Sequence, residues 1–222
     1  MRLLFSAFIF ALLVAGSVAR AQQAQTVISI YGGIQEPLDS RVIGNDPSTG
    51  GAGAFDFIAD WEGRSLQMSP YYGWRVTRWT AGSFGWGVEF THEKAEASAA
   101  TLAANGLDML EFSHGLNLLT LNAYYRWPQT PGGLTPYVGA GAGISIPHVE
   151  FDGGGTRTFN IQAGGPAAVM MAGVSYRIND RFSVFGEYRA SYTSLDVNLA
   201  DGGWLRTDIA SNAFNLGVSY GF

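Results

Sequence analysis

Three histidines are the residues of this chain best suited to catalysis or metal binding. His92, His114 and His148 each lie near one end of a segment in which apolar and polar residues alternate. Histidine transfers protons near neutral pH and is the commonest metal ligand. Carboxylates accompany them in the sequence, at Glu93, Glu96, Asp108, Glu111, Glu150 and Asp152. We therefore predict a catalytic site made of His92, His114, His148, Glu93, Glu111 and Glu150. Within it, His114 and His148 are the predicted ligands of a divalent metal ion, whose identity the sequence leaves open.

The segments that carry these residues have the period of two that is typical of a β-strand. At the end of the chain, Phe214, Leu216 and Val218 fall on one face, together with Tyr220 and Phe222. The other face is small or polar and consists of Ser211, Ala213, Asn215, Gly217, Ser219 and Gly221. A strand with an apolar lipid face and a polar inner face resembles the closing strand of an outer-membrane β-barrel. The pattern predicts a barrel embedded in a membrane.

Eight segments of this kind follow one another along the chain. They cover about residues 26–35, 69–79, 84–90, 115–127, 137–149, 167–178, 182–196 and 209–222. Eight strands enclose an interior just wide enough for side chains to fill. The sequence therefore predicts an all-β fold, an eight-stranded antiparallel transmembrane β-barrel of the outer-membrane type.

The connections between the segments predict the orientation of the barrel. Residues 81–83, 129–135 and 179–180 are short connections, whereas residues 36–66, 99–113 and 152–166 are long ones. Short turns of outer-membrane barrels face the periplasm and long loops face the exterior. The three histidines then lie at the extracellular ends of neighbouring strands, at the height of the lipopolysaccharide headgroups. Aromatic residues near the short turns predict a periplasmic girdle of Trp79, Phe84, Trp127, Tyr176, Phe182 and Tyr220.

The start of the chain and its composition agree with this placement. Arg2, the apolar run over residues 3–15 and the small residues before Gln22 predict a signal peptide over residues 1–21. Residues 22–222 then form a single barrel domain, expected as a monomer in the cell outer membrane of a Gram-negative bacterium. Charged residues make up 14% of the chain, against roughly 25% in soluble domains. A net charge of −5 argues against a nucleic-acid partner, and the absence of cysteine excludes disulfides and thiol chemistry.

The same alternation directs a set of charged and polar side chains into the barrel. These are Arg75, Glu89, Asn122, Arg126, Glu187 and Arg189. Buried charges must be paired, so we expect them to fill a closed interior. A transport channel is not expected.

Strict alternation does not bring the three histidines together. It places His92 and His148 on the lipid-facing sets of their strands but His114 on the inward set. Pro147 beside His148 predicts a bulge that re-aims the histidine toward His114. Histidines that only form hydrogen bonds in loops, or that contact lipid headgroups, are the alternative interpretation.

The stretch from Gly115 to Pro128, with the sequence Gly-Leu-Asn-Leu-Leu-Thr-Leu-Asn-Ala-Tyr-Tyr-Arg-Trp-Pro, resembles the outer-membrane proteins identified as lipid A oxidases. Residues 135–139, 147–150, 165–167 and 184–188 extend the resemblance over the whole barrel. It implies oxygen-dependent oxidation of the proximal glucosamine of lipid A to an aminogluconate, in the outer leaflet. The resemblance supplies no catalytic residues.

Two function classes remain open at this point. The first is a lipid A-modifying oxidase whose partner is lipopolysaccharide and whose chemistry depends on the histidines. The second is a non-enzymatic, OmpA-like surface barrel with a structural role, or one that binds external partners through residues 36–66. Fold alone does not distinguish them.

Overall fold

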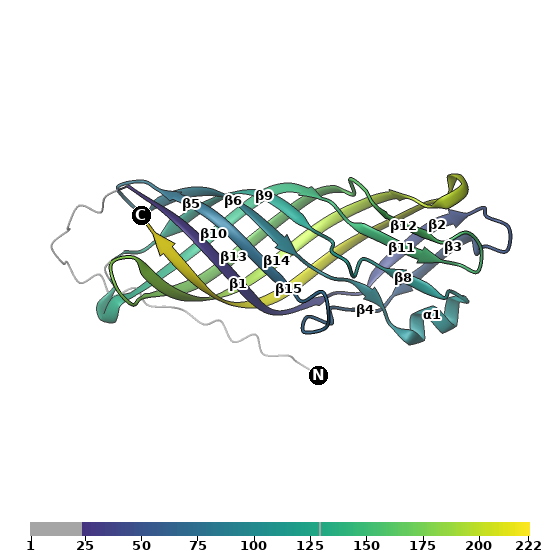
Figure 1. The fold of residues 1–222 in the computed structure, drawn as a ribbon, viewed down its shortest axis with the longest axis horizontal. Helices are drawn as coiled ribbons and strands as arrows, with labels where there is room; N and C mark the ends of the chain where they lie inside the picture. The colour runs from purple at the N-terminus through teal and green to yellow at the C-terminus, as the bar shows by residue number, and fades with distance from the viewer. Residues whose placement is uncertain (1–23, 129) are drawn as a thin grey trace, which may run out of the picture.

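The computed structural model describes residues 24–128 and 130–222, so the predicted signal peptide lies outside the described residues. Eight antiparallel strands wind around a common axis (Figure 1). They are β1 (Gln25–Pro37), β5 (Tyr72–Trp79), β6 (Phe84–His92), β9 (Leu118–Arg126), β10 (Leu134–Ser145), β13 (Gly165–Arg177), β14 (Phe182–Asn198) and β15 (Trp204–Gly221). β1 pairs with β15, from Val27 opposite Gly221 to Pro37 opposite Ser211, and this pairing closes the barrel. The predicted eight-stranded barrel is confirmed.

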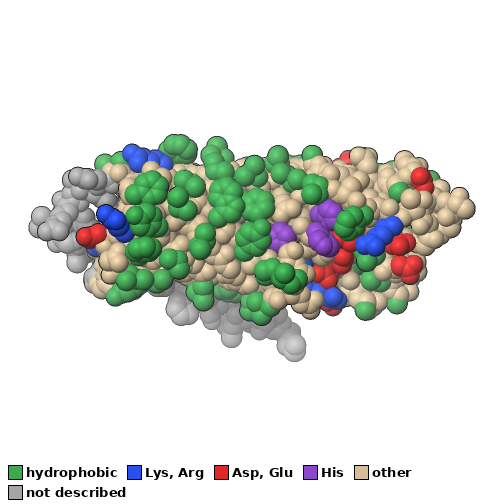
Figure 2. Space-filling model, viewed as in Figure 1, with side chains coloured by type: hydrophobic (Ala, Val, Ile, Leu, Met, Phe, Trp, Pro, Cys, Tyr) green, Lys and Arg blue, Asp and Glu red, His purple; other side chains and the backbone are tan. Residues whose placement is uncertain are grey.

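The two faces of the strands differ as the alternation predicts. In β15 the side chains of Phe214 and Leu216 are exposed, whereas Ala213 and Asn215 between them are buried. Similar outward apolar side chains on the other strands form a belt around the barrel, which covers much of the face shown in Figure 2. This apolar belt faces lipid in a membrane. The only helix in the described residues with α geometry, α1 (Ala99–Asn105), is too short to cross one.

The belt has one exception at the short-turn end. Trp79 was predicted to join the aromatic girdle, but its ring packs inside the barrel against Tyr124 and under the Arg126 guanidinium, 4.2 Å from the ring centroid. Trp79 follows Thr77 on the inward set of β5, so the alternation itself requires this direction. The prediction for Trp79 was therefore wrong.

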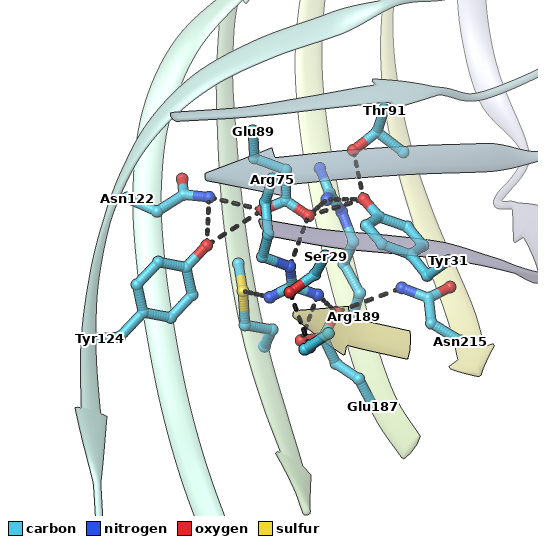
Figure 3. A network of polar contacts seen from close by, with 12 residues as sticks. Ser29, Tyr31, Arg75, Glu89, Thr91, Asn122, Tyr124, Glu187, Arg189 and Asn215 are labelled. Carbon is cyan, nitrogen blue, oxygen red and sulfur yellow. Dashed lines mark hydrogen bonds and ion pairs between the residues drawn. The ribbon is translucent and has the colours of Figure 1, made fainter. Parts of the chain in front are cut away.

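Paired polar groups occupy the middle of the barrel interior (Figure 3). Arg75 donates from Nη2 to both carboxylate oxygens of Glu187 at 2.8 Å, and Arg189 Nη1 donates to Glu89 Oε1 at 2.8 Å. Hydroxyl and amide groups complete the network: Tyr31, Asn122 and Tyr124 donate to Glu89, and Tyr137 and Asn215 donate to Glu187. The predicted pairing of the interior charges is confirmed for four of the five charged residues, and Arg126 is the exception described below. The expectation that they fill the interior was wrong, because a cavity remains between them and the short turns.

The long connections contain more regular structure than predicted. β2 (Ser40–Asp46) and β3 (Gly53–Ala59) form a hairpin that pairs with the extension of β15 beyond the barrel. A second sheet combines β4 (Trp61–Glu62), β7 (Glu96–Ala97), β8 (Met109–Glu111), β11 (His148–Asp152) and β12 (Thr158–Ile161) in the order β12, β11, β8, β7, β4. We call this second sheet the rim sheet. Two short 3-10 turns, η1 (Pro131–Gly133) and η2 (Ala200–Gly202), complete the elements.

A buried apolar cluster holds these connecting elements in place. Trp61, Leu110, Phe112, Phe151 and Leu205 are all at most 2% exposed and belong to one core cluster. These residues come from the rim sheet, its connections and β15, so the cluster joins the two sheets. Burial of large side chains of this kind stabilises by about 1.5–3 kcal/mol each. The rim sheet is therefore a packed extension of the barrel and not a set of open loops.

Candidate functional site

The chain leaves the barrel sheet immediately before His148. β10 ends at Ser145, where a strand continuing to residue 149 was predicted. Ile146 N donates to Asn117 O and His148 N donates to Gly115 O, both at 2.8 Å, so residues 146–148 run alongside residues 115–117. Pro147 between them has no N–H to donate to a ladder. The predicted bulge is in fact a change of sheet, because His148 is the first residue of β11 in the rim sheet.

His114 is carried outward by the turn that precedes β9. Gly115 has φ of +121° and Asn117 has φ of +34°, so the chain turns here and β9 begins only at Leu118. The Asn117 side chain holds the turn by donating to Gly115 O at 3.3 Å and to Ile146 O at 3.1 Å. The prediction that His114 faces inward assumed a strand from residue 115 and was wrong. The His114 side chain is 57% exposed.

His114, His148 and Glu150 come together on this edge. One ligand atom from each lies within 4.8 Å of the other two. His114 Nδ1 contacts Glu150 Oε1, and His148 Nδ1 lies 3.3 Å from the same oxygen. The two imidazole rings meet edge to face with their centroids 5.0 Å apart. Three of the six predicted site residues therefore form one cluster, which we call the His-Glu triad.

Two residues that the sequence analysis did not select border the triad. Arg157 Nη2 donates to Glu150 Oε2 at 2.8 Å, and its guanidinium lies 5.3 Å from the centroid of the Phe159 ring. Phe159 meets the His148 ring edge to face at 4.4 Å. Arg157 immediately precedes β12, and Phe159 lies within it. Phe159 is directly opposite Glu150 in the pairing of β11 with β12. Without that long-range pairing, no signal in the sequence places them beside the histidines.

A row of four glutamates crosses the rim sheet and ends at the triad. Glu150 lies opposite Glu111, Glu111 opposite Glu96, and Glu96 opposite Glu62. Like charges directly opposite one another destabilise a sheet. Basic side chains offset this repulsion for three of the four: Arg64 pairs with Glu62 and Glu96 at 2.8 and 3.1 Å, Lys94 with Glu96 at 3.0 Å, and Arg157 with Glu150 at 2.8 Å. Glu111 is the remaining member of the row.

Glu111 has no basic partner of its own in the described residues. It accepts a 2.9 Å hydrogen bond from Ser113 Oγ, which lies 3.5 Å from His114 Nδ1. Burial raises the pKa of the Glu111 carboxyl above its ordinary value, and the nearby Glu96 and Glu150 carboxylates raise it further, while the Ser113 hydrogen bond acts in the opposite direction. Glu111 is thus a carboxyl group suited to receiving a proton next to the triad.

The remaining two predicted site residues lie outside the triad. His92 Nδ1 donates a hydrogen bond to Asn117 Oδ1 at 2.9 Å, and the ring stacks on Tyr72 with centroids 5.2 Å apart. Glu93 turns into the barrel, where Ser191 Oγ donates to it at 2.8 Å and Arg189 Nε lies 3.7 Å away. Glu93 was predicted at the rim because it follows His92, but successive strand residues point to opposite faces. His92 supports the turn beneath His114, and Glu93 belongs to the interior network.

The triad has the composition of a known class of metal site. Two imidazoles and one carboxylate with open positions are the ligand set of non-haem iron oxygenases, and the same set also binds zinc. Figure 2 shows the histidines on the outer surface, where the apolar belt ends and charged side chains begin. A molecule that reaches the triad therefore lies at the outer boundary of the belt.

The comparisons with known proteins identify the family. The sequence profile of the outer membrane protein beta-barrel domain matches residues 8–222. The chain belongs to this family. The protein is accordingly an outer-membrane protein that crosses the membrane as a β-barrel.

Several solved barrels are similar in structure at low sequence identity. Neisserial surface protein A is 15% identical with a TM-score of 0.48, over 88% of this chain and 96% of that one. The N-terminal barrel of Pseudomonas aeruginosa OprF is 18% identical with a TM-score of 0.43, over 90% and 100%. Pseudomonas aeruginosa OprG is 12% identical with a TM-score of 0.45, over 90% and 97%. No curated protein matches the sequence.

Proposed function

We propose that this protein is an outer-membrane oxidase that modifies lipid A and uses the His-Glu triad as a metal site. The observation that carries the proposal is the convergence of His114, His148 and Glu150 within 4.8 Å. A site of this composition on the outer surface of a membrane barrel is open to the outer leaflet. The resemblance of the sequence to lipid A oxidases supplies the reaction: oxidation of the proximal glucosamine to an aminogluconate.

The position of the triad suits an amphiphilic substrate. Phe159 and Ile161 beside it are 56% and 68% exposed, and the apolar belt lies below it. Arg157 lies on the same edge with a side chain that is 46% exposed. A lipid with acyl chains along the belt would place its sugar headgroup against the triad, with the free donors of Arg157 available to a phosphate or carboxylate group.

The donor atoms fit a bound metal ion. His148 Nδ1 is buried and forms no hydrogen bond within the described residues, although it faces Glu150. A buried nitrogen of this kind is costly unless a partner satisfies it, and a metal ion held with His114 and Glu150 would do so. A redox-active ion in such a site supplies one-electron chemistry with dioxygen. Arg157 holds Glu150 in place through its 2.8 Å hydrogen bond.

The proposed reaction balances with dioxygen as the only oxidant. The anomeric carbon of the glucosamine, as a free hemiacetal, loses two electrons and two protons and becomes a lactone. Dioxygen accepts these electrons and protons and leaves as hydrogen peroxide. Addition of water opens the lactone to the aminogluconate, so the sugar gains one oxygen atom. Glu111 is the residue we assign to take the proton of the anomeric hydroxyl, since its carboxyl lies beside the triad with a raised pKa.

Purified protein tests this proposal directly. The protein in detergent is mixed with lipid A that has a free anomeric hydroxyl, with air or without oxygen, and the products are identified by mass spectrometry. We expect aminogluconate and peroxide in equal amounts with air and neither without oxygen. Asn160→Ala is the matched control, because Asn160 lies on β12 next to Phe159 but its side chain is exposed and turned toward Gln162. Unchanged lipid A in air would refute the proposal and favour a non-enzymatic surface barrel.

The domain division is part of the same proposal. Residues 1–21 act as a signal peptide that is removed, and residues 22–222 form one barrel domain that works as a monomer. N-terminal sequencing of the protein from outer membranes should begin at Gln22, and its mass in detergent should correspond to one chain.

A further inference from the structure

Arg126 is a buried charge for which the described residues provide no ion-pair partner. The residue is 6% exposed, and its Nε and Nη2 atoms form no hydrogen bond within the described residues. Arg75 and Arg189, the other arginines in the interior, form ion pairs with Glu187 and Glu89. The guanidinium of Arg126 lies over the Trp79 ring, 4.2 Å from the ring centroid. An unpaired buried charge is destabilising unless a counter-ion or water satisfies it.

A cavity of about 810 Å³ surrounds this arginine. Its walls come from the inward faces of the strands in the half of the barrel that is nearest the short turns. The turns that contain Pro128, Gly133 and Asn179 form its mouth. Arg75, which forms an ion pair with Glu187, is also part of the lining. The volume is within the range of sites that hold small organic ligands. We call this cavity the periplasmic vestibule.

The vestibule offers positive charge and hydroxyl groups. Arg126, Arg177 and Arg181 line it, and Asp180 is the one acidic side chain among its described lining residues. Small hydroxyl side chains occupy the walls, at Ser29, Thr77, Thr135, Ser175, Ser183 and Ser219. Guanidinium groups bind carboxylates and phosphates through paired hydrogen bonds, and hydroxyls can donate to the remaining oxygens. The lining therefore suits an oxyanion better than a cation or an apolar ligand.

We propose that the periplasmic vestibule binds a small oxyanion, the phosphate or carboxylate group of a periplasmic solute, with Arg126 as its principal ligand. The Trp79 ring lies against one face of the guanidinium, and the Arg126 side chain lines the vestibule, so it can donate to an anion held there. Arg177 and Arg181 at the mouth attract the anion from solution. This site is separate from the His-Glu triad, which lies beyond the opposite end of the apolar belt.

Calorimetric titration of the purified protein in detergent tests the site. Inorganic phosphate is one probe and citrate is the other, so the two arms separate phosphate from carboxylate ligands. We expect the wild type to bind at least one of them at millimolar concentration, and Arg126→Gln to weaken that binding by about tenfold or more, the effect of losing one charged hydrogen-bond partner. Arg126→Lys, which keeps the charge but not the planar fork, should bind with intermediate affinity.

Arg78→Gln is the matched control for charge. Arg78 lies on the same end of the barrel but on the outward face of β5, where it donates to Thr26. We expect Arg78→Gln to bind the probe as the wild type does. Absence of binding by the folded wild type, or equal affinity of Arg126→Gln and the wild type, would overturn the proposal.

Chemical protection provides a measurement that does not depend on the folding of a variant. Phenylglyoxal modifies accessible arginines, and mass spectrometry of peptides reports modification at Arg126 and at Arg78 separately. We expect the bound probe to protect Arg126 but not Arg78 in the wild type. Equal modification of Arg126 with and without the probe would contradict the assignment.

Discussion

His114 and His148 meet edge to face, with ring centroids 5.0 Å apart, although they belong to different connections of the barrel. Two local features produce this contact. The turn at Gly115 and Asn117 directs His114 outward, and the chain after Ser145 leaves the barrel sheet so that His148 runs alongside that turn. The candidate metal site therefore depends on backbone geometry at the rim of the barrel.

The first prediction concerns metal content. The wild-type protein, purified without chelator, should contain a transition metal that His114→Ala, His148→Ala and Glu150→Gln each reduce strongly, because each removes one ligand of the triad. His92→Ala should retain the metal, because His92 contacts Asn117 and Tyr72 rather than the triad. Elemental analysis of the folded variants measures this. Equal metal content in all four variants would show that the triad is not a metal site.

The second prediction concerns the apolar belt. Leu216→Arg should destabilise the barrel by about 2–4 kcal/mol, because the charge must lie in hydrocarbon. Ser219→Arg should cost much less, because Ser219 faces the water-accessible vestibule on the other face of β15. Folding into lipid vesicles at a series of urea concentrations gives both values. Penalties of the same size would mean that the assignment of the two faces is wrong.

The third prediction concerns the interior ion pairs. Glu187→Leu should cost about 3–5 kcal/mol, because Arg75 loses both 2.8 Å hydrogen bonds and keeps only the more distant Glu89 carboxylate at 3.7 Å among its ion pairs in the described residues. The double variant Arg75→Leu/Glu187→Leu should be more stable than Glu187→Leu, because no charge is then left unpaired. Unfolding in urea compares the three proteins. A double variant that is less stable than the single one would indicate that Arg75 is stabilised by other groups.

The fourth prediction concerns pH. The folded protein holds the Glu111 proton more tightly than the unfolded chain, because the pKa of this carboxyl is raised. The contribution of Glu111 to stability is therefore most favourable below its ordinary pKa, and it decreases as pH rises through the interval up to the raised value. Glu111 can accept a proton only when its carboxyl is ionised, so the rate of lipid A oxidation should rise with pH over the same interval. Glu111→Gln should remove both dependences, and a rate profile that Glu111→Gln leaves unchanged would exclude Glu111 as the proton acceptor.

Much of the barrel could be predicted from the sequence, because the alternation of apolar and polar residues is local. The strand of Phe214 and Leu216 is an example, since each residue reports its own face. The rim sheet could not be predicted in this way. Its strands are two to five residues long, and they pair with segments distant in sequence.

The candidate site could be predicted only in part, because some of its contacts are local in sequence and others depend on long-range pairing. Pro147 indicated that His148 changes direction toward His114, and the structure bears this out. Alternation failed for His114 because it cannot be extended through a turn with positive φ, as at Gly115. Arg157 was missed because its contact with Glu150 depends on the pairing of β12 with β11.

The most direct test of the account is the mass of lipid A from cells that produce the wild-type protein, His148→Ala or Asn160→Ala at equal levels in the outer membrane. The account predicts that lipid A from cells with the wild type or Asn160→Ala gains the mass of one oxygen atom on its proximal sugar. Lipid A from cells with His148→Ala should remain unmodified, as should lipid A from cells without the protein. The same gain in cells with His148→Ala would contradict catalysis by the triad, and unmodified lipid A in cells with the wild type would contradict the oxidase itself.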